Sequence, residues 1–220
     1  MDLYLLPGLG ADKRLFGKLD LEGYAVHYLE WPNMPLGSTL SDYARALAPA
    51  IDATRPHVLI GVSMGGMVAQ ELATFTHPVK VIIVSSWKGP QEMPRPLRML
   101  RGTHPERMLT PTVLRQTLPL ARWQMGVELP EDVALFNDLI TVFSVDQLKA
   151  QINACITWNG PSEPLNDLVH IHGDQDRLMP IGYVHAARRI HGGSHFMVYS
   201  KAKEVGEEVK AALRTAFNPS

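Results

Sequence analysis

Short runs rich in Val, Ile and Leu alternate along the chain with amphipathic stretches. This alternation is typical of a parallel β-sheet that is covered by helices. The runs predict strands at residues 3–6, 24–29, 57–60, 79–85 and 168–172, and a further short strand leading into His195. The pattern therefore predicts an α/β fold with a mainly parallel sheet and helices on both faces.

Apolar residues recur at helical spacing in three stretches, each of which we expect to pack against the sheet. The stretches are marked by Leu40, Tyr43, Ala44, Leu47 and Ile51, by Val68, Leu72 and Phe75, and by Val205, Val209, Leu213 and Phe217. Ser38 or Ser41 is the expected N-cap of the first helix, and Pro49 predicts an irregularity near its end.

A long connection separates the fourth predicted strand from the fifth. It has about 80 residues, which is too many for an ordinary loop between two elements. The connection opens with three closely spaced prolines and continues with helical patterns, without a convincing buried strand. We expect residues 87–167 to form an inserted helical lid on a core domain made of residues 1–86 and 168–220.

Charge is divided unevenly within this predicted lid. Residues 88–122 contain seven Lys and Arg against two Glu, whereas residues 123–163 contain six Asp and Glu against one Lys. Two interpretations stay open: the basic half binds an anionic group, or the two halves pair with each other or face solvent. We favour the second interpretation.

The segment Gly61-Val62-Ser63-Met64-Gly65 directly follows a predicted strand and precedes an amphipathic helix. A Gly-x-Ser-x-Gly sequence in this strand-turn-helix context is typical of a nucleophile elbow, in which a strained turn projects a serine hydroxyl above the sheet. The alternative is an ordinary glycine-rich turn with Ser63 as helix N-cap.

A serine hydroxyl is a weak nucleophile at neutral pH, so it needs a general base, and the base needs a carboxylate to orient it. Asp174 and Asp176 follow the last long predicted strand, and His195 stands nineteen residues beyond Asp176. The order Ser, Asp, His along the chain is therefore compatible with a catalytic triad.

With these residues the chain resembles the α/β-hydrolase superfamily, over residues 3 to about 208. Three blocks carry the resemblance: Leu5-Leu6-Pro7-Gly8-Leu9-Gly10-Ala11-Asp12, Gly61-Val62-Ser63-Met64-Gly65-Gly66, and His172-Gly173-Asp174-Gln175-Asp176 with Gly192-Gly193-Ser194-His195-Phe196. The chain looks most like small, compact members that lack the N-terminal hairpin.

The resemblance assigns roles to individual residues. It implies Ser63 as nucleophile, His195 as base and Asp176, rather than Asp174, as the acid. The backbone amides of Leu9 and Met64 are the implied oxyanion hole. Two features depart from the family pattern: Pro7 stands where many members have histidine, and the interval from Asp176 to His195 is short.

The implied activity is that of a serine hydrolase, which cleaves a small or medium acyl ester or thioester through an acyl-enzyme. The alternatives are a C–C bond hydrolase or a cofactor-free perhydrolase with the same triad, and a non-catalytic receptor for a small ligand. Flexible and aromatic residues of the predicted lid suit a partly apolar acyl substrate, or else form the lid's own core. They are Trp87, Met93, Met99, Met108, Trp123, Met125, Phe136, Phe143 and Trp158.

Composition limits the other possibilities. The formal net charge of −1 provides no electrostatic attraction to nucleic acid or acidic membranes. Cys155 is the single cysteine, which excludes an internal disulfide. No His-Glu-x-x-His sequence and no dinucleotide fingerprint is present, so we expect no metal and no cofactor.

The distribution of apolar residues also bears on location. No apolar run reaches the roughly 18 to 20 residues that span a bilayer, and Pro7 interrupts the apolar N-terminus, which does not look like a signal peptide. We expect a cytoplasmic protein that is a monomer or a homodimer.

Overall fold

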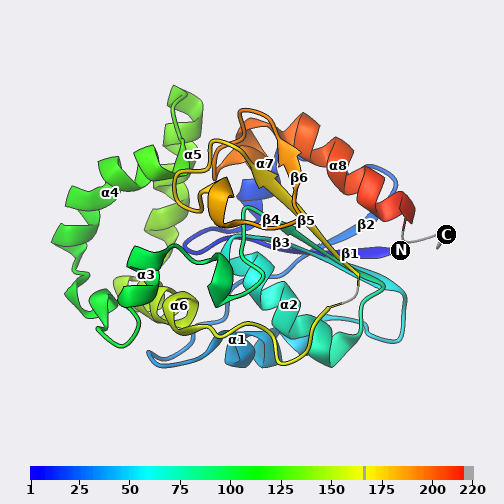
Figure 1. Cartoon of the computed structure of the whole chain (residues 1–220), viewed down its shortest axis with the longest axis horizontal. Helices are drawn as coiled ribbons and strands as arrows, with labels where there is room; N and C mark the ends of the chain where they lie inside the picture. The colour runs from blue at the N-terminus through cyan, green and yellow to red at the C-terminus, as the bar shows by residue number, and fades with distance from the viewer. Residues whose placement is uncertain (166, 216–220) are drawn as a thin grey trace.

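The computed structural model of the protein describes residues 1–165 and 167–215. Within them the chain forms a six-stranded sheet in the order β2-β1-β3-β4-β5-β6, and every neighbouring pair is parallel (Figure 1). The strands are β1 (Asp2–Leu6), β2 (Ala25–Tyr28), β3 (His57–Val62), β4 (Lys80–Val84), β5 (Leu168–Gly173) and β6 (Arg188–Ile190). The predicted α/β fold with a mainly parallel sheet is confirmed.

Both faces of the sheet are buried, because successive side chains of a strand point to opposite sides. Leu3 and Leu5 of β1 belong to one apolar cluster, together with side chains of α8 (Ala202–Thr215). Tyr4 and Leu6 belong to a second cluster, together with side chains of α1 (Leu40–Leu47) and α2 (Met64–Thr76). The sheet is thus a middle layer between two sets of helices.

The start of α1 differs from the expectation. Thr39, and neither Ser38 nor Ser41, is its N-cap. The Thr39 hydroxyl accepts a hydrogen bond from the Asp42 amide at 3.1 Å, and the Asp42 carboxylate accepts one from the Thr39 amide at 2.9 Å. This reciprocal pair satisfies two amide donors at once, which a serine at either neighbouring position would not do in this register.

Three further points concern the end of α1 and the C-terminal helices. Pro49 lies in a short 3-10 helix, Ala48–Ala50, which ends the α1 segment as expected. Another short helix, α7 (Met197–Ser200), precedes α8. Phe217, expected on the last helical stripe, lies outside the described residues.

Between β4 and β5 the chain is helical. The elements are the 3-10 helices Pro90–Glu92 and Pro105–Met108 and the α-helices α3 (Arg95–Met99), α4 (Pro111–Met125), α5 (Pro130–Val142) and α6 (Val145–Thr157). Figure 1 shows α3 to α6 gathered at the end of the sheet that lies opposite the N-terminus. The division into a core domain, 1–86 and 168–220, and a lid, 87–167, stays a prediction.

Candidate active site

Ser63 occupies the turn between β3 and α2, with a φ of 53° and a ψ of −119°. A non-glycine residue with positive φ is strained and persists only when its surroundings hold it. The Ser63 amide donates to the Val84 carbonyl at 2.9 Å, and the Ser63 carbonyl accepts from the Gly66 amide at 2.9 Å and from the Ser86 hydroxyl at 2.7 Å. The turn is therefore held from both sides of the strained residue.

Two glycines make this turn possible because backbone crowds against backbone there. A Cβ on Gly61 would lie 2.2 Å from the Gly65 carbonyl oxygen. A Cβ on Gly65 would lie 2.3 Å from the carbonyl oxygens of both Leu6 and Pro7. No side chain fits at either position without moving main chain, which explains why the sequence has glycine on both sides of Ser63.

Asp176 and His195 are joined directly. His195 Nδ1 lies 2.8 Å from Asp176 Oδ2, and both residues are buried. The second carboxylate oxygen, Oδ1, accepts from the amides of Leu178 at 2.9 Å and Met179 at 2.7 Å. Because an ionised carboxylate only accepts, His195 donates through Nδ1–H, and its Nε2 carries the lone pair that a general base uses.

Asp174 takes a different role in the same turn. Its carboxylate accepts from the Gly192 amide at 2.7 Å and lies 3.0 Å from His191 Nδ1. The hydrogen bond from Gly192 lowers the pKa of the Asp174 carboxyl, and the contact with His191 adds to the effect. Asp174 thus ties the loop before His195 to the end of β5, and Asp176 is the carboxylate against the imidazole.

Ser63 and His195 line one cavity of about 360 Å³. His195 Nε2 is buried and, among the described residues, has no hydrogen-bond partner, so it forms no hydrogen bond with the Ser63 hydroxyl. Hydrogen bonds of catalytic groups are often long before substrate binds. The structure therefore brings Asp176 and His195 into contact, and Ser63 lines the same cavity as His195.

Of the two residues of the expected oxyanion hole, Leu9 lines the cavity, and Met64 directly follows Ser63, which also lines it. Met64 is the first residue of α2, so its amide belongs to the free N–H groups at a helix N-terminus. Within residues 1–165 and 167–215, neither amide donates a hydrogen bond to protein. Neither donor is therefore committed to an acceptor in the described part of the chain.

The loop that carries Leu9 is fixed by two side chains that the sequence does not single out. Trp31 Nε1 donates to the Gly8 carbonyl at 3.0 Å, and Gln151 Oε1 accepts from the Gly10 amide at 2.9 Å. Both hydrogen bonds are buried. Because they hold the residues on either side of Leu9, they set the direction of its amide.

Comparison with known proteins supplies the context for this geometry. Residues 3–208 match the model of the alpha/beta hydrolase family. The chain belongs to the α/β-hydrolase family. None of the curated protein sequences compared with this α/β hydrolase matches it.

Solved structures with the same fold include two bacterial esterase-type proteins. A thermophilic esterase from Thermogutta terrifontis has a TM-score of 0.73 at 15% identity, covering 98% of this chain and 90% of that one. A lipase-esterase related protein from Clostridium acetobutylicum has a TM-score of 0.72 at 20% identity, covering 96% and 93%.

A third structure is YbtT, the type II thioesterase from the yersiniabactin pathway. It has a TM-score of 0.67 at 18% identity and covers 99% of this chain and 94% of that one. At these identities the three likenesses concern the fold.

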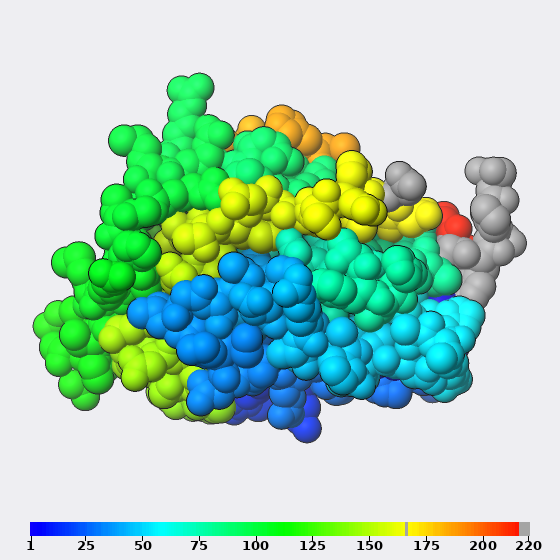
Figure 2. Space-filling model, turned by 90° about the horizontal axis from the view of Figure 1, so that it is seen from below, coloured from blue at the N-terminus to red at the C-terminus, as the bar shows by residue number. Residues whose placement is uncertain are grey.

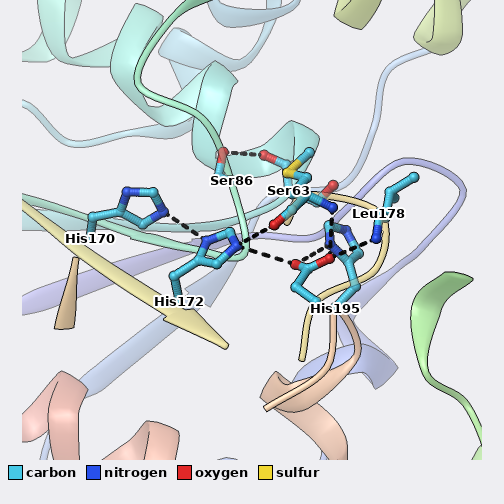
Figure 3. Close-up of polar contacts among 8 residues, drawn as sticks. Ser63, Ser86, His170, His172, Leu178 and His195 are labelled. Carbon is cyan, nitrogen blue, oxygen red and sulfur yellow. Dashed lines mark hydrogen bonds and ion pairs between the residues drawn. The ribbon is translucent and has the colours of Figure 1, made fainter. Parts of the chain in front are cut away.

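A buried histidine pair in this α/β hydrolase extends the Asp176 network (Figure 3). His172 Nε2 lies 2.7 Å from the Met179 carbonyl, which only accepts, so Nε2 carries the hydrogen. His172 Nδ1 then accepts from His170 Nε2 at 3.1 Å. His172 Nε2 also lies 3.5 Å from Asp176 Oδ2. The pair thus supports the turn whose amides hold Asp176.

Both histidines of the pair are neutral near pH 7. Burial lowers the pKa of His172, and it lowers that of His170 to about 2. Both lie in the strand predicted at residues 168–172, and the sequence gives neither a role in the site. Because they are two residues apart, both side chains lie on one side of β5. This spacing was the sequence signal that could have predicted the pair.

The cavity of this α/β hydrolase is lined almost entirely by apolar side chains. The described residues that line the cavity include no Asp, Glu, Lys or Arg. Four of the expected pocket residues line it: Trp87, Met93, Met125 and Phe136. By contrast Met99, Met108 and Trp123 are exposed, so they belong neither to the cavity nor to a core. This correction concerns the outer surface of α3, the 3-10 helix Pro105–Met108 and α4.

Two further properties concern metals and membranes. No group of three or more His, Cys, Asp or Glu in the described part of the chain is arranged to hold a metal ion. No helix there is long and apolar enough to cross a bilayer.

Proposed function

We propose that the protein is a serine hydrolase that cleaves a small or medium acyl ester or thioester. The observation that carries this proposal is the 2.8 Å contact of His195 Nδ1 with Asp176, which leaves the other imidazole nitrogen facing a cavity that Ser63 also lines. Family membership and esterase and thioesterase structures of the same fold support it.

In the first half-reaction His195 Nε2 takes the proton of the Ser63 hydroxyl while Ser63 Oγ attacks the acyl carbon. Asp176 keeps the imidazole in the required tautomer and stabilises the imidazolium. The amides of Leu9 and Met64 donate to the oxyanion, and losing one such donor costs about 3 to 4 kcal/mol of transition-state stabilisation. The tetrahedral intermediate collapses when His195 returns the proton to the leaving alcohol or thiol.

The second half-reaction repeats these steps with water. Water loses a proton to His195 Nε2 and attacks the acyl carbon of the acyl-Ser63 ester. Breaking the bond to Ser63 Oγ releases the carboxylic acid, and the proton on His195 passes back to the serine oxygen. Every step uses the same imidazole nitrogen, because Nδ1 is committed to Asp176.

The lining of the cavity indicates which part of the substrate it takes. Its side chains are apolar, and its volume of about 360 Å³ is at the small end of ligand cavities. Burying an uncharged acyl chain among these side chains is favourable, whereas an anionic chain would lose its hydration without a cationic partner. We therefore assign the cavity to an aliphatic acyl group of small or medium length.

The assignment is tested with a fluorophosphonate probe, which phosphonylates activated serines. Wild type, Ser63→Ala and His195→Ala are compared with Ser41→Ala, a serine of α1 outside the cavity. We expect the probe to label wild type and Ser41→Ala and to label neither active-site variant. Labelling of another serine in Ser63→Ala would contradict the proposed nucleophile.

Turnover of p-nitrophenyl esters of increasing acyl length then tests the substrate class. We expect kcat/KM to rise with acyl length and to fall once the chain outgrows the cavity. A probe-labelled Ser63 without turnover of any ester would contradict the esterase assignment and favour a ligand receptor on the same fold.

A further inference from the structure

The outer surface of residues 95–123 is unusual in what it exposes. Neither α3 nor α4 contains a fully buried residue. Figures 1 and 2 show this segment, in green, forming the end of the molecule opposite the N-terminus. We call its exposed side chains the α3–α4 surface; they include Arg95, Arg98, Met99, Arg107, Met108, Arg115, Leu120 and Trp123.

The α3–α4 surface is strongly cationic. Residues 93–125 contain six arginines and one acidic residue, Glu106. Glu106 is only 3% exposed and lies 3.1 Å from His104 Nδ1, so it contributes no exposed negative charge. None of the six arginines forms an ion pair with a described residue. Arg101 donates hydrogen bonds to the carbonyls of Thr157 and Trp158 at 2.8 and 2.9 Å. The charge of the other five arginines is left for an external partner.

The acidic half of the predicted lid does not neutralise these arginines. Glu128 pairs with Arg177 at 3.4 Å, and Asp132 pairs with Lys18 at 3.5 Å. Both cations lie outside residues 87–167. The interpretation in which the two halves pair with each other thus receives no support from the ion pairs of the described chain.

Large apolar side chains stand among the arginines. Met99 and Met108 are 78% and 76% exposed, and Trp123 and Leu120 are 58% and 56% exposed. Exposed apolar groups of this size are costly in water unless a partner covers them. Arginines interleaved with Met, Leu and Trp match the interface of an anionic bilayer, where guanidinium groups bind phosphates and apolar side chains enter the acyl region.

We infer that the α3–α4 surface docks the protein on an anionic lipid bilayer. The net charge of −1 does not oppose this, because the attraction falls off within a Debye length and local charge decides it. Leu97, Ala121 and Met125, on the inner side of the same two helices, line the cavity. Docking would therefore bring α3 and α4, the helices that carry these lining residues, against the membrane.

Trp123 provides a built-in reporter. The other three tryptophans, Trp31, Trp87 and Trp158, are at most 9% exposed. Insertion of Trp123 into a bilayer predicts a blue shift of the intrinsic emission and quenching by lipids with brominated acyl chains. Both signals are expected with phosphatidylglycerol vesicles at low salt, and both should disappear in Trp123→Phe.

Binding itself is measured by co-sedimentation with vesicles of phosphatidylcholine and phosphatidylglycerol in equal parts, and with pure phosphatidylcholine. We expect binding to the anionic vesicles, little binding to the neutral ones, and release in 0.5 M NaCl. Each arginine near the surface contributes roughly a fivefold factor in affinity. The triple variant Arg95→Glu, Arg98→Glu, Arg115→Glu should therefore bind at least about 100-fold more weakly.

A matched triple variant controls for net charge: Arg45→Glu, Arg189→Glu, Lys203→Glu, on α1, β6 and α8. It should bind anionic vesicles within about fivefold of wild type, the contribution of one surface cation. Both triples should hydrolyse a short soluble ester like wild type, since none of the six residues lines the cavity. That activity separates failure of the docking proposal from failure of the proposed function.

Three results would overturn the docking proposal. The first is no binding of wild type to anionic vesicles at low salt, and the second is an equal loss of binding in both triples. The third is binding to soluble polyglutamate, or self-association in size-exclusion chromatography, without vesicle binding; these would indicate an acidic protein or a second copy as the partner.

Discussion

His195 and Asp176 are joined by a buried 2.8 Å hydrogen bond, while Asp174, two residues away in the chain, bonds to Gly192 and His191. The two carboxylates of one turn thus have separate tasks. One orients an imidazole, and the other closes a loop.

This separation predicts different effects for two equivalent substitutions. Asp176→Asn should lower kcat by about 10⁴-fold, because an amide can donate to Nδ1 and favour the tautomer without a free Nε2 lone pair. Asp174→Asn should keep kcat within about tenfold of wild type, because it weakens hydrogen bonds in the loop rather than the His195 contact. Steady-state hydrolysis of a short p-nitrophenyl ester measures both. Comparable losses in the two variants would contradict the assignment.

The hydrogen bond from Gly10 to Gln151 predicts an effect on turnover. Gln151→Met keeps the length of the side chain but removes the acceptor, and it leaves a buried amide unpaired next to Leu9. We expect kcat to fall about tenfold with a smaller change in KM, because the Leu9 amide matters most in the transition state. Equal kcat with raised KM would mean that Gln151 shapes the cavity only.

Close main-chain packing at Gly65 predicts a severe effect of one methyl group. Gly65→Ala should abolish activity and lower the melting temperature, since its Cβ would lie 2.3 Å from two carbonyl oxygens. Gly206→Ala is the matched control within α8, where the nearest atom to an added Cβ is 3.5 Å away. There alanine should raise the free energy of unfolding by up to about 1 kcal/mol, because alanine has a higher helix propensity than glycine. Differential scanning calorimetry distinguishes the two.

The His170 imidazole predicts acid sensitivity of the fold. Burial lowers its pKa to about 2, whereas a histidine of the unfolded chain titrates near the ordinary pKa of 6.5. Between these values the unfolded state binds more protons, so the free energy of unfolding falls as pH decreases, by up to about 1.4 kcal/mol per pH unit for one proton.

Urea unfolding of His170→Phe between pH 7 and pH 4 tests this linkage. In the variant, the slope of the free energy of unfolding against pH should be smaller than in wild type by up to about 1.4 kcal/mol per pH unit, the contribution of one proton. His77→Asn, at an exposed left-handed helix cap where asparagine is tolerated, should keep the wild-type slope. An unchanged slope in His170→Phe would show that His170 is accessible to protons in the folded protein.

Much of the fold was predictable because strand signals are local. Runs such as residues 57–60 and 168–172 are short, apolar and bounded by turns, and each became a strand. The resemblance to the superfamily implied Asp176 as the partner of His195, and the structure places these two side chains in contact, while their catalytic roles stay a prediction. The N-cap at Thr39 was mispredicted because three hydroxyl residues within residues 38–41 compete, and only side-chain geometry decides among them.

Other features depended on distant parts of the chain. Gln151 reaches Gly10 across 141 residues, and no local pattern marks it. Met99, Met108 and Trp123 have the composition of a core, yet all three are exposed, and α3 and α4 bury no residue completely. Helical periodicity shows which residues share a face, but it does not show whether another element covers that face.

The hydrogen bond from the Ser63 amide to the Val84 carbonyl has a consequence for how the protein loses activity on heating. It joins the strained turn at Ser63 to strand β4 at the centre of the sheet, so the turn cannot relax while β3 and β4 stay paired. On heating, the Ser63 hydroxyl should consequently keep its native position until β3 and β4 separate. Thermal inactivation and global unfolding are then one event rather than two.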